Sequence, residues 1–253
     1  MTGAALRVAS SASLVLFPVL LSQGMRVRRT TPRLPEAPGE REGVTPGDGP
    51  PLRLLMIGES TAAGVGAESH VDGLPGLTAR ALAERVERAV AWRVLGRNGA
   101  TARAALTDLL TPAADVRADV AVIVLGVNDT LRFHSPARWR RDLEALVAAV
   151  RERCGPVPVV LAGVPPVGRF PALPQPLRGV LGLRAALLDH TARRLAGALP
   201  DTRHVGTPVL DASVDAYFCA DRFHPSPLGY AAWAAALGES AAALITTNRD
   251  PAP

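Results

Sequence analysis

Short apolar runs alternate with amphipathic stretches along most of the chain. Residues 54–57, 119–125 and 157–162 are almost wholly apolar, and each run ends at a glycine. Such runs are typical of strands that are covered on both faces, as in a parallel sheet. With two shorter candidates at 92–95 and 204–206, the pattern predicts five strands.

The stretches between these runs have helical periodicity. In residues 73–91, for example, Leu74, Leu77, Leu82 and Val86 recur at the spacing of one helix face. The other predicted helices cover residues 103–110, 136–153, 177–199 and 226–244. Alternation of strands and helices predicts the α/β class, and we expect a three-layer α/β/α sandwich around a five-stranded parallel sheet.

The first 51 residues differ from the rest. Residues 13–21 are strongly apolar and are followed by Arg26, Arg28 and Arg29. This run is shorter than the roughly 20 residues that span a bilayer, and no A-x-A cleavage pattern follows it. We therefore expect segment 1–31 to form a helix that docks on the domain or makes peripheral membrane contact through residues 8–29. A secretory signal remains the alternative, but the arginines favour a cytoplasmic location.

Proline, glycine and charged residues dominate positions 32–51, which predicts an extended linker that is poorly ordered unless something ties it down. The main folded domain is then expected at 52–247, with a short tail at 248–253. Nothing in the sequence indicates an oligomeric state.

The amino-acid composition limits the classes of binding partner that are expected. Only 4% of the 253 residues are aromatic, and the 28 basic residues, all arginine, are scattered and leave a net charge of +5. Neither feature favours nucleic-acid binding, so no nucleic-acid partner is expected. Cys154 and Cys219 lack the short spacing of metal ligands, so no metal site is expected either.

Polar residues that suit ester hydrolysis follow several predicted strands. Ser60 comes after the first strand, Gly99 after the second, Asn128 after the third, and Asp221 and His224 precede the last helix. Ser60 can serve as nucleophile, His224 as its general base and Asp221 as the acid that orients the imidazole. The backbone amides of Ser60 and Gly99 and the side-chain amide of Asn128 can form an oxyanion hole.

Each of these residues also has a purely structural interpretation. Ser60 suits a helix N-cap, Asn128 suits a turn, and Asp221 could cap the last helix with His224 on the surface. The joint pattern favours catalysis over these separate roles.

The four blocks, in this order, resemble those of the SGNH, or GDSL-type, hydrolases, and the resemblance spans about residues 52–244. It implies a flavodoxin-like sheet, the catalytic set Ser60, Asp221 and His224, oxyanion donors at Ser60, Gly99 and Asn128, and no metal or organic cofactor. Glu59 departs from the family pattern, which has Asp before the serine. Since this acid is not the nucleophile, we expect altered loop hydrogen bonding and not lost activity.

The loops suggest the class of substrate. Phe170 and Leu173 in the proline-rich loop 165–174 could form an apolar wall for an acyl chain or simply cover the core, and Phe133 could meet an acyl group. We expect a hydrolase of small to medium carboxylic esters, acting on a small-molecule ester or lipid. The alternatives are a carbohydrate deacetylase, a lysophospholipase, an acyltransferase and a catalytically silent lipid- or ligand-binding module.

Overall fold

A computed structural model describes residues 17–208 and 215–249. Within this part of the chain, six strands form one sheet in the order β1-β3-β2-β4-β5-β6. Strands β2 to β6 run parallel to their neighbours, whereas β1 is antiparallel to β3. Their bounds are Glu42–Thr45 for β1, Leu52–Gly58 for β2, Val90–Gly96 for β3, Val120–Val124 for β4, Val159–Ala162 for β5 and Thr202–Val205 for β6.

The five predicted parallel strands are confirmed, but the predicted strand count of five is wrong by one. The sixth strand, β1, comes from the segment expected to be a linker, where Gly43 pairs with Trp92 and Val44 with Ala91. A Cβ atom on Gly43 would lie 2.7 Å from the Trp92 ring, so a glycine allows this close approach. Pairing with the edge of the sheet orders these four residues, and no local apolar pattern predicts this pairing.

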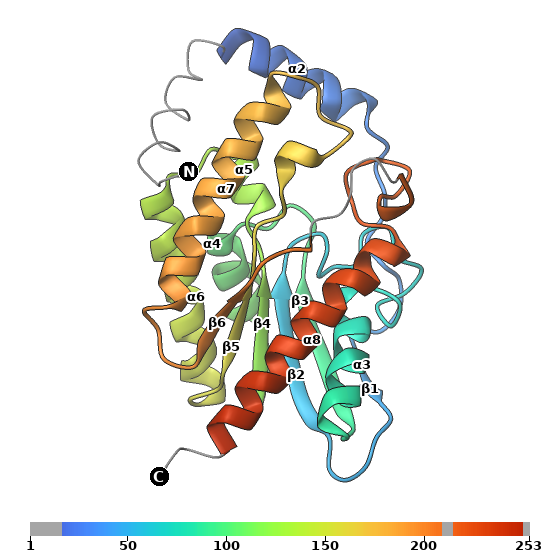
Figure 1. Ribbon diagram of the computed structural model, residues 1–253, viewed down its shortest axis with the longest axis vertical. Helices are drawn as coiled ribbons and strands as arrows, with labels where there is room; N and C mark the ends of the chain where they lie inside the picture. Colours follow the sequence, from blue (N-terminus) through green and yellow to red (C-terminus); the bar gives the residue numbers. More distant parts are fainter. Residues whose placement is uncertain (1–16, 209–214, 250–253) are drawn as a thin grey trace.

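The helices cover both faces of the sheet, as Figure 1 shows. Helices α3 and α8 pack against one face, and α6 and α7 against the other, each with its own apolar cluster. The predicted three-layer α/β/α architecture is confirmed. The bounds are Phe17–Thr30 for α2, Leu74–Val86 for α3, Ala102–Ala104 for α4, Val127–Leu131 for α5, Pro136–Cys154 for α6, Leu177–Ala196 for α7 and Pro227–Arg249 for α8, and α4 continues as a π-helix at Ala105–Leu110.

Helix α3 is shorter than its apolar periodicity predicts. It ends at Val86, where Glu87 adopts a left-handed conformation with φ of 51°. Residues expected to continue the helix, Val90 and Ala91, instead begin β3 and pair with Leu52 and Arg53. Sheet pairing therefore overrides local helical preference at this boundary.

Among the described residues, one helical stretch, Pro227–Thr247, is long and apolar enough to cross a membrane. It belongs to α8, and 61% of its most apolar window is buried inside the protein. A Cβ atom on Gly238 would lie 2.7 Å from the Cβ atom of Ala81 in α3, so the two helices are in close contact there. The apolar character of α8 is thus accounted for by the core.

The connections place the carboxyl ends of β2 and β4 at a reversal of strand order. From β2 the chain moves to β3 on one side, and then to β4, β5 and β6 on the other. In open α/β sheets, ligands bind in the crevice outside the strand ends at such a reversal. The predicted site residues Ser60 and Asn128 follow β2 and β4 respectively.

Candidate active site

Ser60 lies in the tight turn that follows β2 and is mostly buried, with 7% of its surface exposed. The preceding Gly58 contacts the neighbouring strand so closely that a Cβ atom there would lie 2.4 Å from the carbonyl oxygen of Val124. The Glu59 amide donates to that same carbonyl at 3.0 Å. The turn is therefore attached to the end of β4, and Ser60 is held at the edge of the sheet.

Gly99 belongs to the loop after β3 and has a φ of 81°, in the region that favours glycine. The Arg97 amide donates to the Gly58 carbonyl at 3.2 Å, which ties this loop to the serine turn. Thr101 then begins α4, and its hydroxyl accepts the Ala104 amide proton at 3.3 Å. The backbone of Gly99 is thus fixed between a strand end and a capped helix start.

Asn128 is held by Glu59. The Glu59 carboxylate accepts hydrogen bonds from the backbone amides of Val127 and Asn128, both at 2.9 Å, and from the Asn128 side-chain nitrogen at 2.6 Å. This contact uses one of the two protons on the Asn128 side-chain nitrogen. Glu59 therefore orients the third predicted oxyanion donor.

Burial is the main influence on Glu59, and it raises the pKa of this carboxyl to about 7, with the hydrogen bonds from Asn128 and Val127 opposing the increase. Glu59 was expected to alter the hydrogen bonding of this loop, and its hydrogen-bond partners are Val127 and Asn128. Its longer side chain reaches the first turn of α5.

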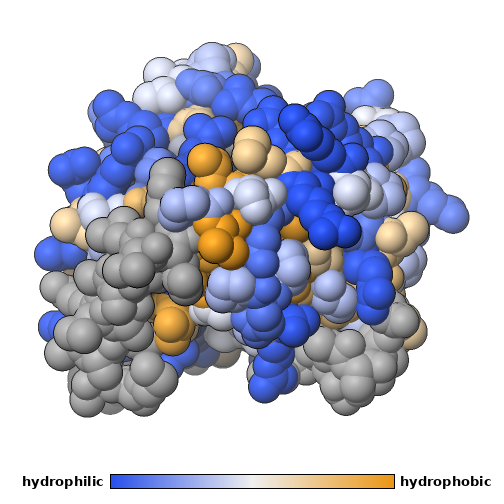
Figure 2. Space-filling model, turned by 90° about the horizontal axis from the view of Figure 1, so that it is seen from above, coloured by the Kyte–Doolittle hydropathy of each residue, from blue (hydrophilic) through white to orange (hydrophobic). Residues whose placement is uncertain are grey.

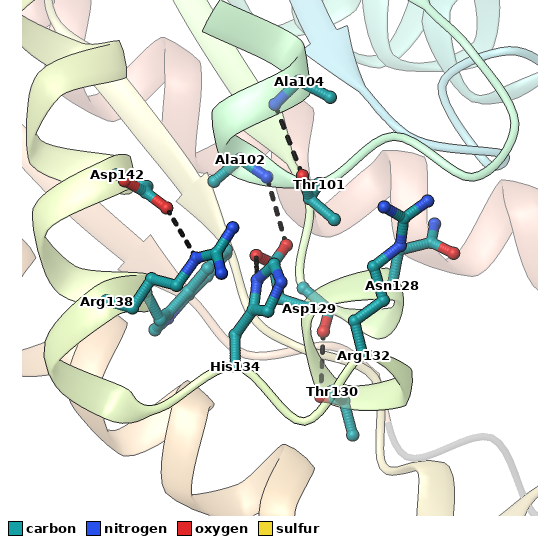
Figure 3. A network of polar contacts seen from close by, with 12 residues as sticks. Thr101, Ala102, Ala104, Asn128, Asp129, Thr130, Arg132, His134, Arg138 and Asp142 are labelled. Carbon is teal, nitrogen blue, oxygen red and sulfur yellow. Dashed lines mark hydrogen bonds and ion pairs between the residues drawn. The ribbon is translucent and has the colours of Figure 1, made fainter.

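Asp129, the next residue, points the other way and is fully buried. Its carboxylate accepts the Ala102 amide proton at 3.1 Å and lies 2.8 Å from Nδ1 of His134 (Figure 3). Burial raises the pKa of Asp129, although the contacts with His134 and Ala102 lower it. This network joins the start of α4, just after Gly99, to α5, which carries Asn128, so it fixes the distance between two of the predicted oxyanion donors.

Asp221 and His224 form a close pair before α8. The His224 Nδ1 atom lies 2.6 Å from Oδ2 of Asp221, and the backbone amides of Phe223 and His224 donate to Oδ1 at 3.0 Å each. Burial favours a raised pKa, but these hydrogen bonds outweigh it and hold the pKa of Asp221 below its ordinary value. An ionised Asp221 keeps the proton on Nδ1, which leaves Nε2 as the basic nitrogen.

These residues converge on one place. Ser60 and His224 line the same small pocket, and Gly99, Asn128 and His224 line a larger groove beside it. The structure therefore brings together all five residues of the predicted catalytic and oxyanion set. Within the described residues, no cluster of three or more His, Cys, Asp or Glu side chains could hold a metal ion.

The sequence of residues 56–232 matches the GDSL-like Lipase/Acylhydrolase family. The chain is also 32% identical over 247 residues to a GDSL-like esterase of Mycobacterium tuberculosis, a match that covers 91% of this chain and 78% of that protein. This chain belongs to the GDSL-like lipase/acylhydrolase family.

Solved structures agree with this assignment of the GDSL-like fold. A lipase/acylhydrolase from Enterococcus faecalis matches with a TM-score of 0.58 at 25% identity, covering 74% of this chain and 94% of that one. A carbohydrate esterase family 2 enzyme from Corynascus thermopiles matches with a TM-score of 0.60 at 15% identity, covering 80% of this chain and 69% of that one. The second likeness concerns the fold alone.

The three candidate substrate-binding residues of this GDSL-like protein lie on different sides of His224. Phe170 lines the small pocket and makes edge-to-face contacts with Phe218 and Phe223 at centroid distances of 6.0 and 4.9 Å. Leu173 and Phe133 line the larger groove instead. Phe170 and Leu173 are also part of the core, so the interpretation of loop 165–174 as a cover of the core is confirmed, whereas its role as an acyl wall stays a prediction.

Two buried acids beside the candidate site have partners that the sequence alone does not predict. The sequence marks Glu59 only as a departure from the family pattern and indicates no role for Asp129. The available signal was an acid soon after a buried strand, directly after β2 for Glu59 and in α5 after β4 for Asp129, where it becomes buried and must find hydrogen-bond donors.

Proposed function

We propose that this chain is a serine-dependent hydrolase of carboxylic esters that carry a short acyl group. The Ser60 Oγ atom attacks the ester carbonyl while Nε2 of His224 takes the hydroxyl proton. Amide donors at Ser60, Gly99 and Asn128 stabilise the oxyanion. The alcohol leaves with the proton from His224, water attacks the acyl-enzyme with His224 again as base, and the acid is released from a regenerated Ser60.

The observation that carries this proposal is the 2.6 Å contact between His224 and Asp221 beside the pocket that Ser60 lines. An Asp–His pair can be purely structural, but this one borders the pocket that Ser60 lines. If the imidazole becomes positively charged during the reaction, the ionised carboxylate stabilises it.

The size of the small pocket supports the choice of a short acyl group. Its volume is about 40 Å³, and its wall is mainly apolar, with Pro165, Phe170, Phe218 and Trp233 among the lining residues. Since one water molecule needs roughly 10–15 Å³ measured in this way, the space suits an acetyl group or one slightly longer.

The order of the reaction steps indicates which part of the ester occupies the small pocket and which occupies the groove. The acyl group stays attached to Ser60 through the second half of the reaction, whereas the alcohol must leave and water must enter from the same side. The groove of about 1030 Å³ gives that access, and the small pocket is enclosed enough to retain the acyl group.

The test is hydrolysis of p-nitrophenyl esters from acetate to palmitate by the parent and by the Ser60→Ala variant. We expect the highest kcat/KM for acetate or propionate and a loss of about a thousandfold or more in the variant. Glu239→Gln, at an exposed position on α8, is the control and should match the parent. Equal rates for parent and Ser60→Ala, with labelling by a fluorophosphonate absent in both, would favour a binding module.

A further inference from the structure

The groove beside His224 opens onto large apolar side chains that are exposed to solvent. Eight large hydrophobic residues of the described chain are exposed, and four of them line this groove. Leu21 and Met25 belong to α2, and Leu131 and Phe133 come from the end of α5 and the loop after it, with exposed fractions between 37% and 50%. Two segments more than 100 residues apart thus place apolar side chains at one opening.

Helix α2 has two apolar faces with different roles. Leu20 is buried in the core, and the Gln23 side chain accepts the Leu177 amide proton at 3.1 Å and donates to the Gln175 carbonyl at 2.7 Å. These contacts fasten the helix to the start of α7. Leu21 and Met25 take no part in those contacts, so holding the helix in place does not require them to be apolar.

Positive charge surrounds this opening. Helix α2 carries Arg26, Arg28 and Arg29 and no acidic residue. Arg28, Arg33 and Arg132 line the groove itself, and among the described residues that line it the only acid is Asp221, which is paired with His224. Figure 2 shows hydrophobic residues gathered near the centre of this face, with hydrophilic residues beside them. Apolar side chains beside basic ones are what binds helices to the interface of an anionic membrane.

We propose that this surface, formed by Leu21, Met25, Leu131, Phe133 and the arginines of α2, docks on an anionic lipid surface. In the docked position the groove opens toward the lipid, and its inner end is lined by Gly99, Asn128 and His224. An amphiphilic ester can then enter from the membrane with its larger alcohol part along the groove. That delivery rests on the proposed esterase function, whereas the docking itself does not.

The test measures binding to vesicles and uses the full chain with Ser60→Ala, so that no substrate is consumed. The vesicles consist of phosphatidylcholine alone or of an equimolar mixture with phosphatidylglycerol, and bound protein is measured by co-sedimentation. We expect strong binding only to the mixed vesicles, and weaker binding as salt screens the charges. Arg28→Gln together with Arg29→Gln should lower the partition coefficient about 25-fold, from about fivefold per arginine.

Substitutions of single apolar residues test which side chains form the docking surface. Leu21→Ser on α2 and Phe133→Asn on the loop should each weaken binding about tenfold, because each removes side-chain carbons from the lipid contact. Asn tolerates the left-handed conformation of Phe133, whose φ is 55°. Val44→Ser on β1, at a residue that is 65% exposed and outside the groove, is the matched control and should bind as the parent does.

Several results would overturn the proposal. Absence of vesicle binding, equal binding to both lipid compositions, or a Phe133→Asn variant that binds like the Val44→Ser control would each do so. The loop variant is decisive because it leaves residues 1–31 intact and so separates this surface from any contribution of the N-terminal segment. Thermal unfolding of each variant checks the fold, and the arginine pair offers a test that leaves the core untouched. Failure of the soluble-ester assay would refute the esterase function without affecting the vesicle result.

Discussion

Replacement of Glu59 by glutamine exchanges one carboxylate oxygen for an amino group in the buried contact that holds Asn128. The carboxylate oxygens accept three hydrogen bonds, one at Oε1 and two at Oε2. A glutamine oxygen can replace Oε2, but its amino group then faces the Val127 amide, which is also a donor. We expect the substituted side chain to shift and the Asn128 side chain to lose its fixed orientation.

The size of the effect on activity follows from the role of Asn128. Complete loss of one oxyanion donor costs about 3 kcal/mol of transition-state stabilisation, which is about a hundredfold in rate. A misoriented donor loses part of this, so kcat of Glu59→Gln should fall about 10- to 100-fold. KM should change little, because the oxyanion exists only in the transition state and the intermediate.

Stability should respond in a pH-dependent manner. The pKa of Glu59 is raised from 4.5 to about 7 in the folded protein, chiefly by burial. Between these values the folded state binds a proton that the unfolded state has released, so the stability of the parent falls as pH rises through this window. A difference of 7 − 4.5 = 2.5 pKa units corresponds to about 3 kcal/mol, at 1.36 kcal/mol each. The glutamine variant lacks this dependence.

The assay compares the parent, Glu59→Gln and Glu59→Asp. Steady-state hydrolysis of p-nitrophenyl acetate at mildly alkaline pH gives kcat and KM, and urea unfolding across the pH window gives the free energy of unfolding. Glu59→Asp keeps the charge and restores the residue of the family pattern, so its kcat should stay closer to that of the parent. The reasoning is refuted if Glu59→Gln keeps the parent's kcat, or if the stability difference between the two proteins is constant with pH.

Three further predictions concern the surroundings of the site. Asp129→Asn should lower the free energy of unfolding by about 2 kcal/mol, since the buried carboxylate that Ala102 and His134 share is replaced by a neutral amide with a single acceptor oxygen, and urea unfolding measures the loss. Phe170→Ala should cost about 3 kcal/mol of stability and move the optimum of the p-nitrophenyl ester series toward longer acyl chains, because the pocket widens; an unchanged optimum would separate Phe170 from acyl selection. Asp221→Asn should lower kcat about ten-thousandfold. The pKa of Asp221 in the folded protein lies below the ordinary 3.8. The ionised carboxylate therefore stabilises the fold above pH 3.8, and this contribution is lost as pH falls through the lower, folded-state pKa. Acid unfolding of the parent and of Asp221→Asn measures this difference.

Local apolar runs and helical periodicity were sufficient to predict the five parallel strands, the layers and the place of the candidate catalytic residues. Strands covered on both faces, such as β2 and β4, are apolar along nearly their whole length, and parallel strands place their carboxyl ends at one edge, so Ser60, Gly99 and Asn128 gather there. The pair Asp221 and His224 was also predictable, because three residues of spacing suffice to bring them together. These inferences need only the chain's own pattern and the rules of parallel sheets.

Contacts between distant segments were decided by the tertiary structure alone. Residues 42–45 form a strand because the edge of β3 offers hydrogen-bonding partners, and nothing in their own pattern requires it. The three donors that Glu59 finds are on α5, 68 and 69 positions along the chain. Likewise, α2 could be predicted as apolar and basic, but which of its residues face the core and which face the groove depends on where it meets α7. The sequence by itself determined which segments are buried; the partners they meet depend on long-range packing, which no local pattern encodes.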